Sequence, residues 1–369
     1  MQRSKESEKF KTFKLLLMNK IFKYFAAFLL TGLLIIPFNE LSAGNKDRTG
    51  QAGASELLIN PWARSSGWGG VNVSGVKGLE GLFTNVAGTA HTTGTELIFS
   101  HTQWLKGSDI DINTFGLTQK VGNGGVIGLG IMSMNFGDIP IRTEELPEGG
   151  IGNFTPSYMN INISYAKAFS NSIYGGINIK IVSEVISDVS AQGIAIDAGI
   201  QYVTGPRDNA RFGITLRNVG PTMRFNGDGL SFRSLLPGQE SYFTLEQRSA
   251  DFELPTQLAM GASYDFLFAD IHRLTIAGNF ISNSFTKDQF IFGAEYELKS
   301  YLMLRGGYTY EEGITSDTDR TSAFTGPSAG FTVAVPLNKE KGSSIAIDYS
   351  YRATDPFSGT HSIGARINL

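Results

Sequence analysis

The sequence contains no cysteine. This absence excludes disulfides, thiolate metal sites, cysteine nucleophiles and a lipid-modified N-terminal cysteine. Histidine is scarce, and the four histidines are scattered over the chain at His91, His101, His272 and His361. A histidine-rich metal site is therefore not expected, and we predict no cofactor.

The chain also lacks an excess of charge of either sign. Lys plus Arg number 31 against 34 for Asp plus Glu, which leaves a net charge of −3. Because a phosphate backbone is bound by clustered basic residues, nucleic acid is not an expected partner. Proline is scarce at 12 residues, whereas glycine reaches 44 and aromatic residues 11%. This balance is typical of closely spaced strands joined by tight turns.

Long apolar runs are missing except near the N-terminus. Residues 24–38 are largely apolar and follow several lysines. They precede Leu41-Ser42-Ala43, which places small residues at the positions that a signal peptidase recognises. We predict a signal peptide over residues 1–43, with Met18 as an alternative start. A permanent helical anchor is the alternative, although about fifteen apolar residues are short for a core roughly 30 Å thick.

After Ala43 no apolar run approaches the length of a membrane-spanning helix, so a membrane would have to be crossed by strands. From Thr95 onward apolar residues recur at every second position, which predicts strands with one apolar and one polar face. The resulting expectation is an all-β, antiparallel barrel of about fourteen strands over residues 95–369. The strands are predicted near 95–104, 111–120, 125–136, 157–169, 172–183, 193–203, 210–219, 256–268, 272–284, 288–298, 302–310, 327–336, 343–352 and 360–369.

The connections between these strands alternate in length. Short connections are expected at one end of the barrel, and longer ones near 137–156, 184–192, 220–255, 311–326 and 353–359 at the other, where 105–110 and 285–287 are the short exceptions. Bacterial outer-membrane barrels pair short periplasmic turns with long extracellular loops. The pattern therefore favours a transmembrane barrel in outer-membrane lipid over a soluble β-sandwich, which would also alternate.

If the apolar positions face lipid, the alternate positions face the lumen and carry charges. Simple hairpin registers place Asp197 opposite Arg217, Glu295 opposite Arg305, and Asp348 opposite Arg366. Unpaired charges inside a narrow barrel are costly, so we predict these three ion pairs. A polar conduit is the functional alternative.

Residues 44–94 precede the first strand and form a separate segment. Residues 51–93 are rich in glycine and lack alternation, which suits a plug folded inside the barrel. A flexible periplasmic tail is the alternative. The candidate plug residues are Trp62, Trp68, Leu79, Phe83, Asn85 and Gly88.

Several segments resemble the PorV/PorQ family, outer-membrane proteins of the Bacteroidota type IX secretion system related to FadL-type barrels. The first is residues 53–59, GASELLI, and the second is residues 211–223, RFGITLRNVGPTM. Further likeness lies in 254–264, 293–308 and 347–369, so the resemblance covers nearly all of the chain after the signal peptide. Two departures are Thr84 to Thr89, where the family has Trp-Asn-Pro-Ala-Gly-Leu, and a final Leu369 in place of Phe. The first departure indicates a divergent paralogue, and the second weakens a sorting signal while keeping its apolar character.

The resemblance implies a barrel that binds secreted cargo proteins by their C-terminal signal domain and docks on the type IX secretion channel. The partners would be gripped by the long outer loops. The candidate residues there are Arg142, Glu144, Arg224, Phe225, Arg233, Tyr242, Phe243 and Phe324.

Two other functions compete with this prediction. One is passive uptake of hydrophobic solutes, as in FadL relatives, with the plug as a gate. The other is an enzyme that uses His101 or His361 with Ser100 or Ser362 on the closing strands, but no lipase-like motif accompanies these residues, so we do not expect an enzyme.

Overall fold

The computed structural model describes residues 48–122, 124–238, 240–268, 271–338 and 342–369. The predicted signal peptide, residues 1–43, lies outside the described residues. Within this part of the chain, no helix has both the length and the apolar character needed to cross a membrane.

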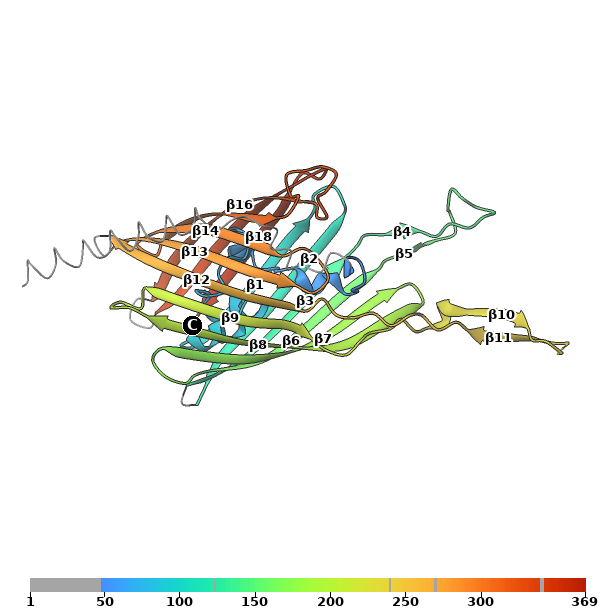
Figure 1. The fold of residues 1–369 in the computed structure, drawn as a ribbon, viewed down its shortest axis with the longest axis horizontal. Helices are drawn as coiled ribbons and strands as arrows, with labels where there is room; N and C mark the ends of the chain where they lie inside the picture. Colours follow the sequence, from blue (N-terminus) through green and yellow to red (C-terminus); the bar gives the residue numbers. More distant parts are fainter. Residues whose placement is uncertain (1–47, 123, 239, 269–270, 339–341) are drawn as a thin grey trace, which may run out of the picture. The chain divides into compact units, whose positions relative to one another are not determined.

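Fourteen antiparallel strands form a closed barrel, as predicted (Figure 1). Neighbours in sequence are neighbours in the barrel, and β1 pairs with β18 to close it, with Glu96 opposite Asn368. The barrel strands are β1 (Thr95–Trp104), β2 (Ile110–Val121), β3 (Gly125–Asn135), β6 (Ser157–Ala168), β7 (Ile173–Ile186), β8 (Val189–Thr204), β9 (Ala210–Val219), β12 (Gln257–Phe268), β13 (His272–Asn283), β14 (Gln289–Leu298), β15 (Leu302–Glu311), β16 (Phe324–Asn338), β17 (Ser343–Thr354) and β18 (Thr360–Asn368).

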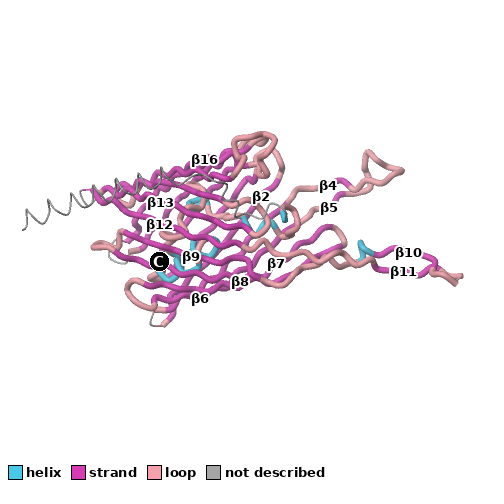
Figure 2. The backbone as a smooth tube through the Cα atoms, viewed as in Figure 1, coloured by secondary structure: helices cyan, strands magenta, loops and turns pink. Residues whose placement is uncertain are grey.

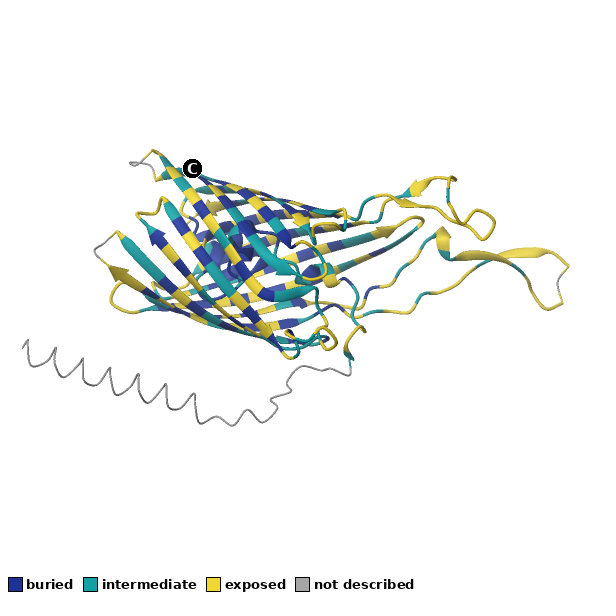
Figure 3. Ribbon diagram, turned by 90° about the horizontal axis from the view of Figure 1, so that it is seen from above, coloured by how far each residue is buried: buried dark blue, intermediate teal, exposed yellow. Residues whose placement is uncertain are grey.

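The strands bury every second residue, because successive side chains point to opposite faces. In β8 the outward Ile194, Ile196 and Ile200 are exposed, whereas Ala195 and Asp197 between them are buried in the lumen. The same alternation of exposed and buried residues runs along the other strands (Figure 3). Because the exposed residues are mainly Ile, Leu, Phe and Tyr, the outer wall is that of a barrel in contact with hydrocarbon.

The two ends of the barrel differ. One end, here called the turn end, carries short connections such as 205–209 and 299–301. The opposite end, the hairpin end, carries two small hairpins that extend away from the barrel (Figure 2). They are β4 (Ile139–Pro140) with β5 (Asn153–Phe154), and β10 (Ser231–Leu235) with β11 (Tyr242–Glu246).

The prediction of a long loop over 184–192 is wrong. Strands β7 and β8 continue beyond the barrel wall and pair as far as Ile186 and Val189, which leaves a two-residue turn. Ser187 in this turn has a φ of +51°, a left-handed conformation suited to a tight hairpin. The apolar alternation stops earlier than the strands do, because this extension lies outside the lipid-facing wall.

The segment before β1 lies inside the barrel, where its short helices are seen behind the strands (Figure 2). It contains the 3-10 helices η2 (Ser55–Leu58), η3 (Gly78–Phe83) and η4 (Val86–His91) and the one-turn helix α2 (Ala63–Ser66). A further 3-10 turn, η5 (Asp228–Leu230), precedes β10. Residues 48–94 are here called the inner segment.

Candidate functional site: the barrel lumen and the hairpin end

Apolar side chains of the inner segment fill the lumen toward the hairpin end. Trp62 and Phe83 meet edge to face with ring centroids 5.5 Å apart, and both are buried with Leu79. They pack in one apolar cluster with the inward Met132 of β3 and with Met223, which lies in the connection between β9 and β10. Trp68 is buried separately, with Val71 and wall residues of β12 to β14.

Asn85 and Gly88 hold the backbone of the inner segment in place. The Asn85 side chain accepts a hydrogen bond from the backbone N–H of Ala87 and donates to the carbonyl oxygens of Val73 and Ile200. It therefore ties η4 to strand β8 while capping the helix. A Cβ on Gly88 would lie 2.6 Å from the Val76 carbonyl oxygen, so the close approach of these chains requires glycine.

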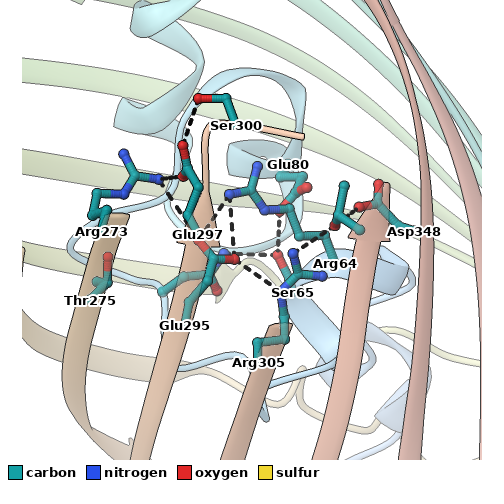
Figure 4. A network of polar contacts seen from close by, with 12 residues as sticks. Arg64, Ser65, Glu80, Arg273, Thr275, Glu295, Glu297, Ser300, Arg305 and Asp348 are labelled. Atoms are coloured by element: carbon teal, nitrogen blue, oxygen red, sulfur yellow. Dashed lines mark hydrogen bonds and ion pairs between the residues drawn. The ribbon is translucent and has the colours of Figure 1, made fainter. Parts of the chain in front are cut away.

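A network of ion pairs joins the inner segment to the wall (Figure 4). Glu295 on β14 lies opposite Arg305 on β15 and receives its Nε–H at 2.9 Å. Arg64 of α2 binds the same carboxylate at 3.2 Å. The predicted Glu295–Arg305 pair is thus present, but a third residue from the inner segment shares it.

The Asp348–Arg366 pair has a similar third partner. The two residues are not directly opposite, because Asp348 faces Gly364 and Arg366 faces Ala346. The long guanidinium side chain crosses the diagonal, and its Nη2 lies 3.4 Å from the Asp348 carboxylate. Arg366 also binds Glu80 of η3 at 3.3 Å, and Glu80 accepts a hydrogen bond from Ser65.

The predicted Asp197–Arg217 pair is wrong. A β-bulge shifts the β8–β9 register between Ile196 and Ala198, so Asp197 has no partner directly opposite on β9. Its carboxylate binds Lys180 of β7 at 2.7 Å and accepts the backbone N–H of Asn218. Arg217 instead donates to the Phe83 carbonyl oxygen and to the Gln257 side chain.

Sequence reasoning missed other charged lumen residues. Arg211 of β9 binds Asp265 of β12, and Arg273 of β13 binds Glu297 of β14. All four occupy inward positions that alternate with apolar residues, as does Lys180 between Ile179 and Ile181. That period-two pattern was the signal from which these lumen charges could have been identified. Arg64 and Glu80 carry no such signal, because the inner segment has no periodicity.

His91 lies at the end of η4 and is neutral in its surroundings. Its ring contacts that of Tyr174 at a tilt of 32°, with centroids 4.0 Å apart, and its Nε2 lies 3.1 Å from the Gln201 side-chain oxygen. Burial, with the positive charge of Lys77, lowers the pKa of His91 to about 4. Because Gln201 uses its amide to donate to Val73 and Val76, its oxygen is free to accept the Nε2–H of His91.

The lumen contains a polar cavity of about 230 Å³ between the inner segment and β9 to β15. Its charged lining residues are Arg64, Lys77, Glu80, Arg211, Arg273, Glu295 and Glu297. A cavity so lined favours water and ions over an apolar solute.

At the hairpin end, the predicted partner-binding residues divide into two groups. Arg142 and Glu144 in the β4–β5 loop are exposed, as are Arg233, Tyr242 and Phe243 in the β10–β11 hairpin. Arg224 lies 3.7 Å from Asp251.

The second group is engaged within the chain. Phe225 packs against Phe252 at 5.7 Å between ring centroids. Phe324 lies in β16 rather than in a loop, under the Arg352 guanidinium at 3.7 Å and beside Trp104. These two aromatic residues are half-buried by their neighbours and are less available to a partner than the sequence suggests.

The β10–β11 hairpin exposes apolar side chains beyond the barrel. Its register places Phe232 opposite Leu245 and Ser234 opposite Phe243 on one face, whereas Arg233 and Thr244 lie on the other. The other face also carries Leu235 opposite Tyr242, and these side chains are 51% and 69% exposed. Apolar groups gathered on a surface that faces water indicate a site of interaction.

The histidines and serines of the closing strands β1 and β18, weighed above as a catalytic pair, hydrogen-bond to other residues. Ser100 donates to the Pro61 carbonyl oxygen, Ser362 accepts from Thr102, and His361 lies 2.9 Å from the Tyr349 hydroxyl. His101 binds Asn113 at 3.0 Å. In the described ranges no three His, Asp or Glu side chains are grouped as metal ligands.

No family model matches the sequence, and no curated protein matches it. Solved structures of similar fold include the toluene transporter TodX of Pseudomonas putida, with 13% identity over 84% of this chain and 97% of that one, at a TM-score of 0.53. Another is the CymD monoaromatic hydrocarbon channel, with 13% identity over 84% and 97% of the two chains, at a TM-score of 0.50. The fold is therefore that of the FadL-type barrels.

Proposed function

We propose that the protein is an outer-membrane barrel that binds a protein partner through its β10–β11 hairpin. The observation that carries this proposal is the apolar face of the exposed Phe232 and Phe243, with the half-buried Leu245 beside them, beyond the lipid-facing wall. An apolar surface in such a place is stabilised when a second protein covers it. Exposed apolar residues of the β4–β5 loop, such as Leu146 and Ile151, add further apolar surface at the hairpin end.

The resemblance to the PorV/PorQ family suggests the partner's identity. On this basis the hairpin end binds secreted cargo, the type IX secretion channel, or both. We also propose that residues 1–43 are a signal peptide that directs export, and that the inner segment acts as a plug. The ion pairs of Arg64 and Glu80 with the wall support the latter role, because they link the segment to strands β14 and β18.

A double substitution on the hairpin tests the proposal. Phe232→Ser with Phe243→Ser removes the apolar face, and we expect at least a tenfold loss of the secretion channel or cargo that co-purifies with the barrel from detergent-solubilised membranes. Large aromatic residues dominate the binding energy of many interfaces, so we expect the binding free energy to weaken by more than about 2 kcal/mol.

The matched control is Arg233→Ser with Thr244→Ser, on the opposite face of the same hairpin. It should leave co-purification unchanged. Equal recovery of partners by wild type and the apolar-face variant would refute the proposal.

A second function, passive transport of apolar small molecules, is favoured by a different observation. The solved structures of similar fold include hydrocarbon channels, and the apolar cluster that fills the lumen toward the hairpin end, with Trp62, Phe83 and Met132, is chemically compatible with an apolar solute. The charged cavity on the path toward the turn end opposes it.

A further inference from the structure

We propose that the lumen cavity around Lys77 binds a small oxyanion, a phosphate or carboxylate group. This inference is independent of the proposed function, because the cavity lies inside the barrel, apart from the β10–β11 hairpin. It rests on the cavity, on donors without acceptors, and on the charge balance of the lining.

The cavity can be reached from the turn end of the barrel. A second cavity, of about 300 Å³, shares Arg64 and Lys77 with the first and is bounded by Gly94, Gly342 and Leu369, which lie at the ends of β1, β17 and β18. Lys77 therefore stands where the two meet. Since one water occupies about 30 Å³ of liquid, the first cavity, of about 230 Å³, has room for a small anion and several waters.

The carboxylates of the lining already have cationic partners. Glu80 binds Arg366, Glu297 binds Arg273, and Glu295 binds both Arg64 and Arg305. They are therefore poorly placed to neutralise a further cation.

Lys77 is the lining cation without such a partner. In the part of the chain that the structure describes, its ammonium group makes no ion pair or hydrogen bond, and its side chain lines both cavities. Burial, together with the positive charges of Arg211 and Arg273, lowers the pKa of Lys77. A bound anion would relieve this repulsion.

Two guanidinium groups of the lining also have a donor to spare. The Nε–H groups of Arg211 and Arg273 are buried and make no hydrogen bond within the described structure. Arg211 is 8% exposed, and its Nη1 and Nη2 are occupied by Asp265. A buried donor left unpaired is costly, so a small rotation of either side chain toward an acceptor in the cavity is favoured.

The donors favour an oxyanion over other ligand classes. Arginine Nε–H groups and a lysine ammonium form strong charge-assisted bonds with carboxylate and phosphate oxygens. Ser263 lies on the same lining and accepts from Ser74, which leaves its own hydroxyl hydrogen free to donate. An apolar solute would leave all these groups unsatisfied.

Calorimetric titration of the full chain in detergent micelles tests this site, with inorganic phosphate and acetate as probes at pH 7. We expect one or both anions to bind, and Lys77→Met to weaken binding at least about tenfold, the usual effect of losing a charged hydrogen bond. Lys77→Arg should retain binding. The matched control is Lys106→Met, in an exposed turn at the hairpin end.

Ser263→Ala provides a second variant that leaves every charge in place, and we expect it to weaken binding about threefold to tenfold. This variant keeps the proposal testable if Lys77→Met disturbs folding. Absence of phosphate and acetate binding by the wild type would overturn the site. So would equal affinities in wild type and in whichever of the two variants folds.

Discussion

At the scale of single residues, the lumen is organised by ion pairs that share a member: Arg366 binds both Glu80 and Asp348, and Glu295 binds several cations. Glu295 lies within 3.9 Å of groups on Arg64, Arg273 and Arg305, which come from the inner segment and from two strands. An ion pair removed from water needs close geometry and several hydrogen bonds to offset its desolvation. Sharing one carboxylate among three cations supplies them.

Reversing the charge of Glu295 should destabilise the protein, and a second, compensating reversal should restore only part of the lost stability. Glu295→Lys places a new ammonium group among three guanidinium groups, and we expect the free energy of unfolding to fall by about 3–5 kcal/mol. Adding Arg305→Glu should restore part of the loss, because Arg64 and Arg273 still face the new lysine. Urea titration followed by tryptophan fluorescence measures the effect.

Glu148→Lys, in the exposed β4–β5 loop, is the control for this pair of changes and should leave the unfolding midpoint unchanged. Full recovery in the double variant would show that Arg64 contributes nothing to the site.

His91 predicts a dependence of stability on pH. Its pKa is lowered from 6.5 to about 4, so the unfolded chain binds a proton in this interval that the folded chain does not. The free energy of unfolding should therefore fall as the pH drops from about 6.5 to 4, by on the order of 2 kcal/mol from this group. Urea midpoints measured across that range test it.

His91→Gln removes the titrating group and should flatten the profile over the same range. The matched control is Gln103→Asn, at an exposed position without a titrating group, which should leave the profile as it is in the wild type. An unchanged slope in His91→Gln would contradict the assignment.

At the scale of elements, inward glycines of the strands determine how closely the inner segment approaches the wall. A Cβ on Gly307 would lie 2.4 Å from the Trp68 carbonyl oxygen, and one on Gly213 would lie 2.5 Å from that of Val73. Both distances are shorter than any normal contact, so an alanine would force the two backbones apart. Glycine is needed at these two positions because it leaves room for the inner segment, and not because the backbone adopts an unusual conformation there.

Gly307→Ala should loosen the inner segment while leaving the strands paired. We expect a loss of about 1–3 kcal/mol in unfolding free energy, typical of overpacking, together with faster proteolysis within residues 48–94. The neighbouring Gly306 supplies the control, because its Cβ would meet nothing closer than the Ser328 carbonyl oxygen at 3.7 Å. If Gly306→Ala and Gly307→Ala behave alike, close packing against Trp68 is not the cause.

At the scale of the whole molecule, the filled lumen lets an uptake experiment distinguish the two proposed functions. With the apolar cluster packed on the hairpin-end side and ion pairs beneath it, we expect Gram-negative cells that produce the protein to take up toluene no faster than cells that lack it. Initial rates of uptake of labelled toluene measure this. Faster uptake would favour the channel function, and the β10–β11 apolar-face variant should not change it.

Much of the fold was predictable from the sequence, whereas the site was predictable only in part. The strand positions were predicted to within a few residues, because lipid requires an apolar residue at each outward position and the period is local. The Glu295–Arg305 pair followed from a simple hairpin register, since β14 and β15 have no bulge. The Asp197–Arg217 pair failed because one bulge between β8 and β9 displaced the partner.

The barrel, its strand number and its lipid-facing wall were thus determined by the sequence alone, through a pattern that repeats every two residues. The partners of the lumen charges and the course of the inner segment were decided only by the tertiary structure. Arg64 and Glu80 are distant in sequence from Glu295 and Arg366, and no periodicity marks their side of the contact. Closure of the barrel brings these groups together in a space too small to leave them unpaired, which is why only the folded chain reveals the network.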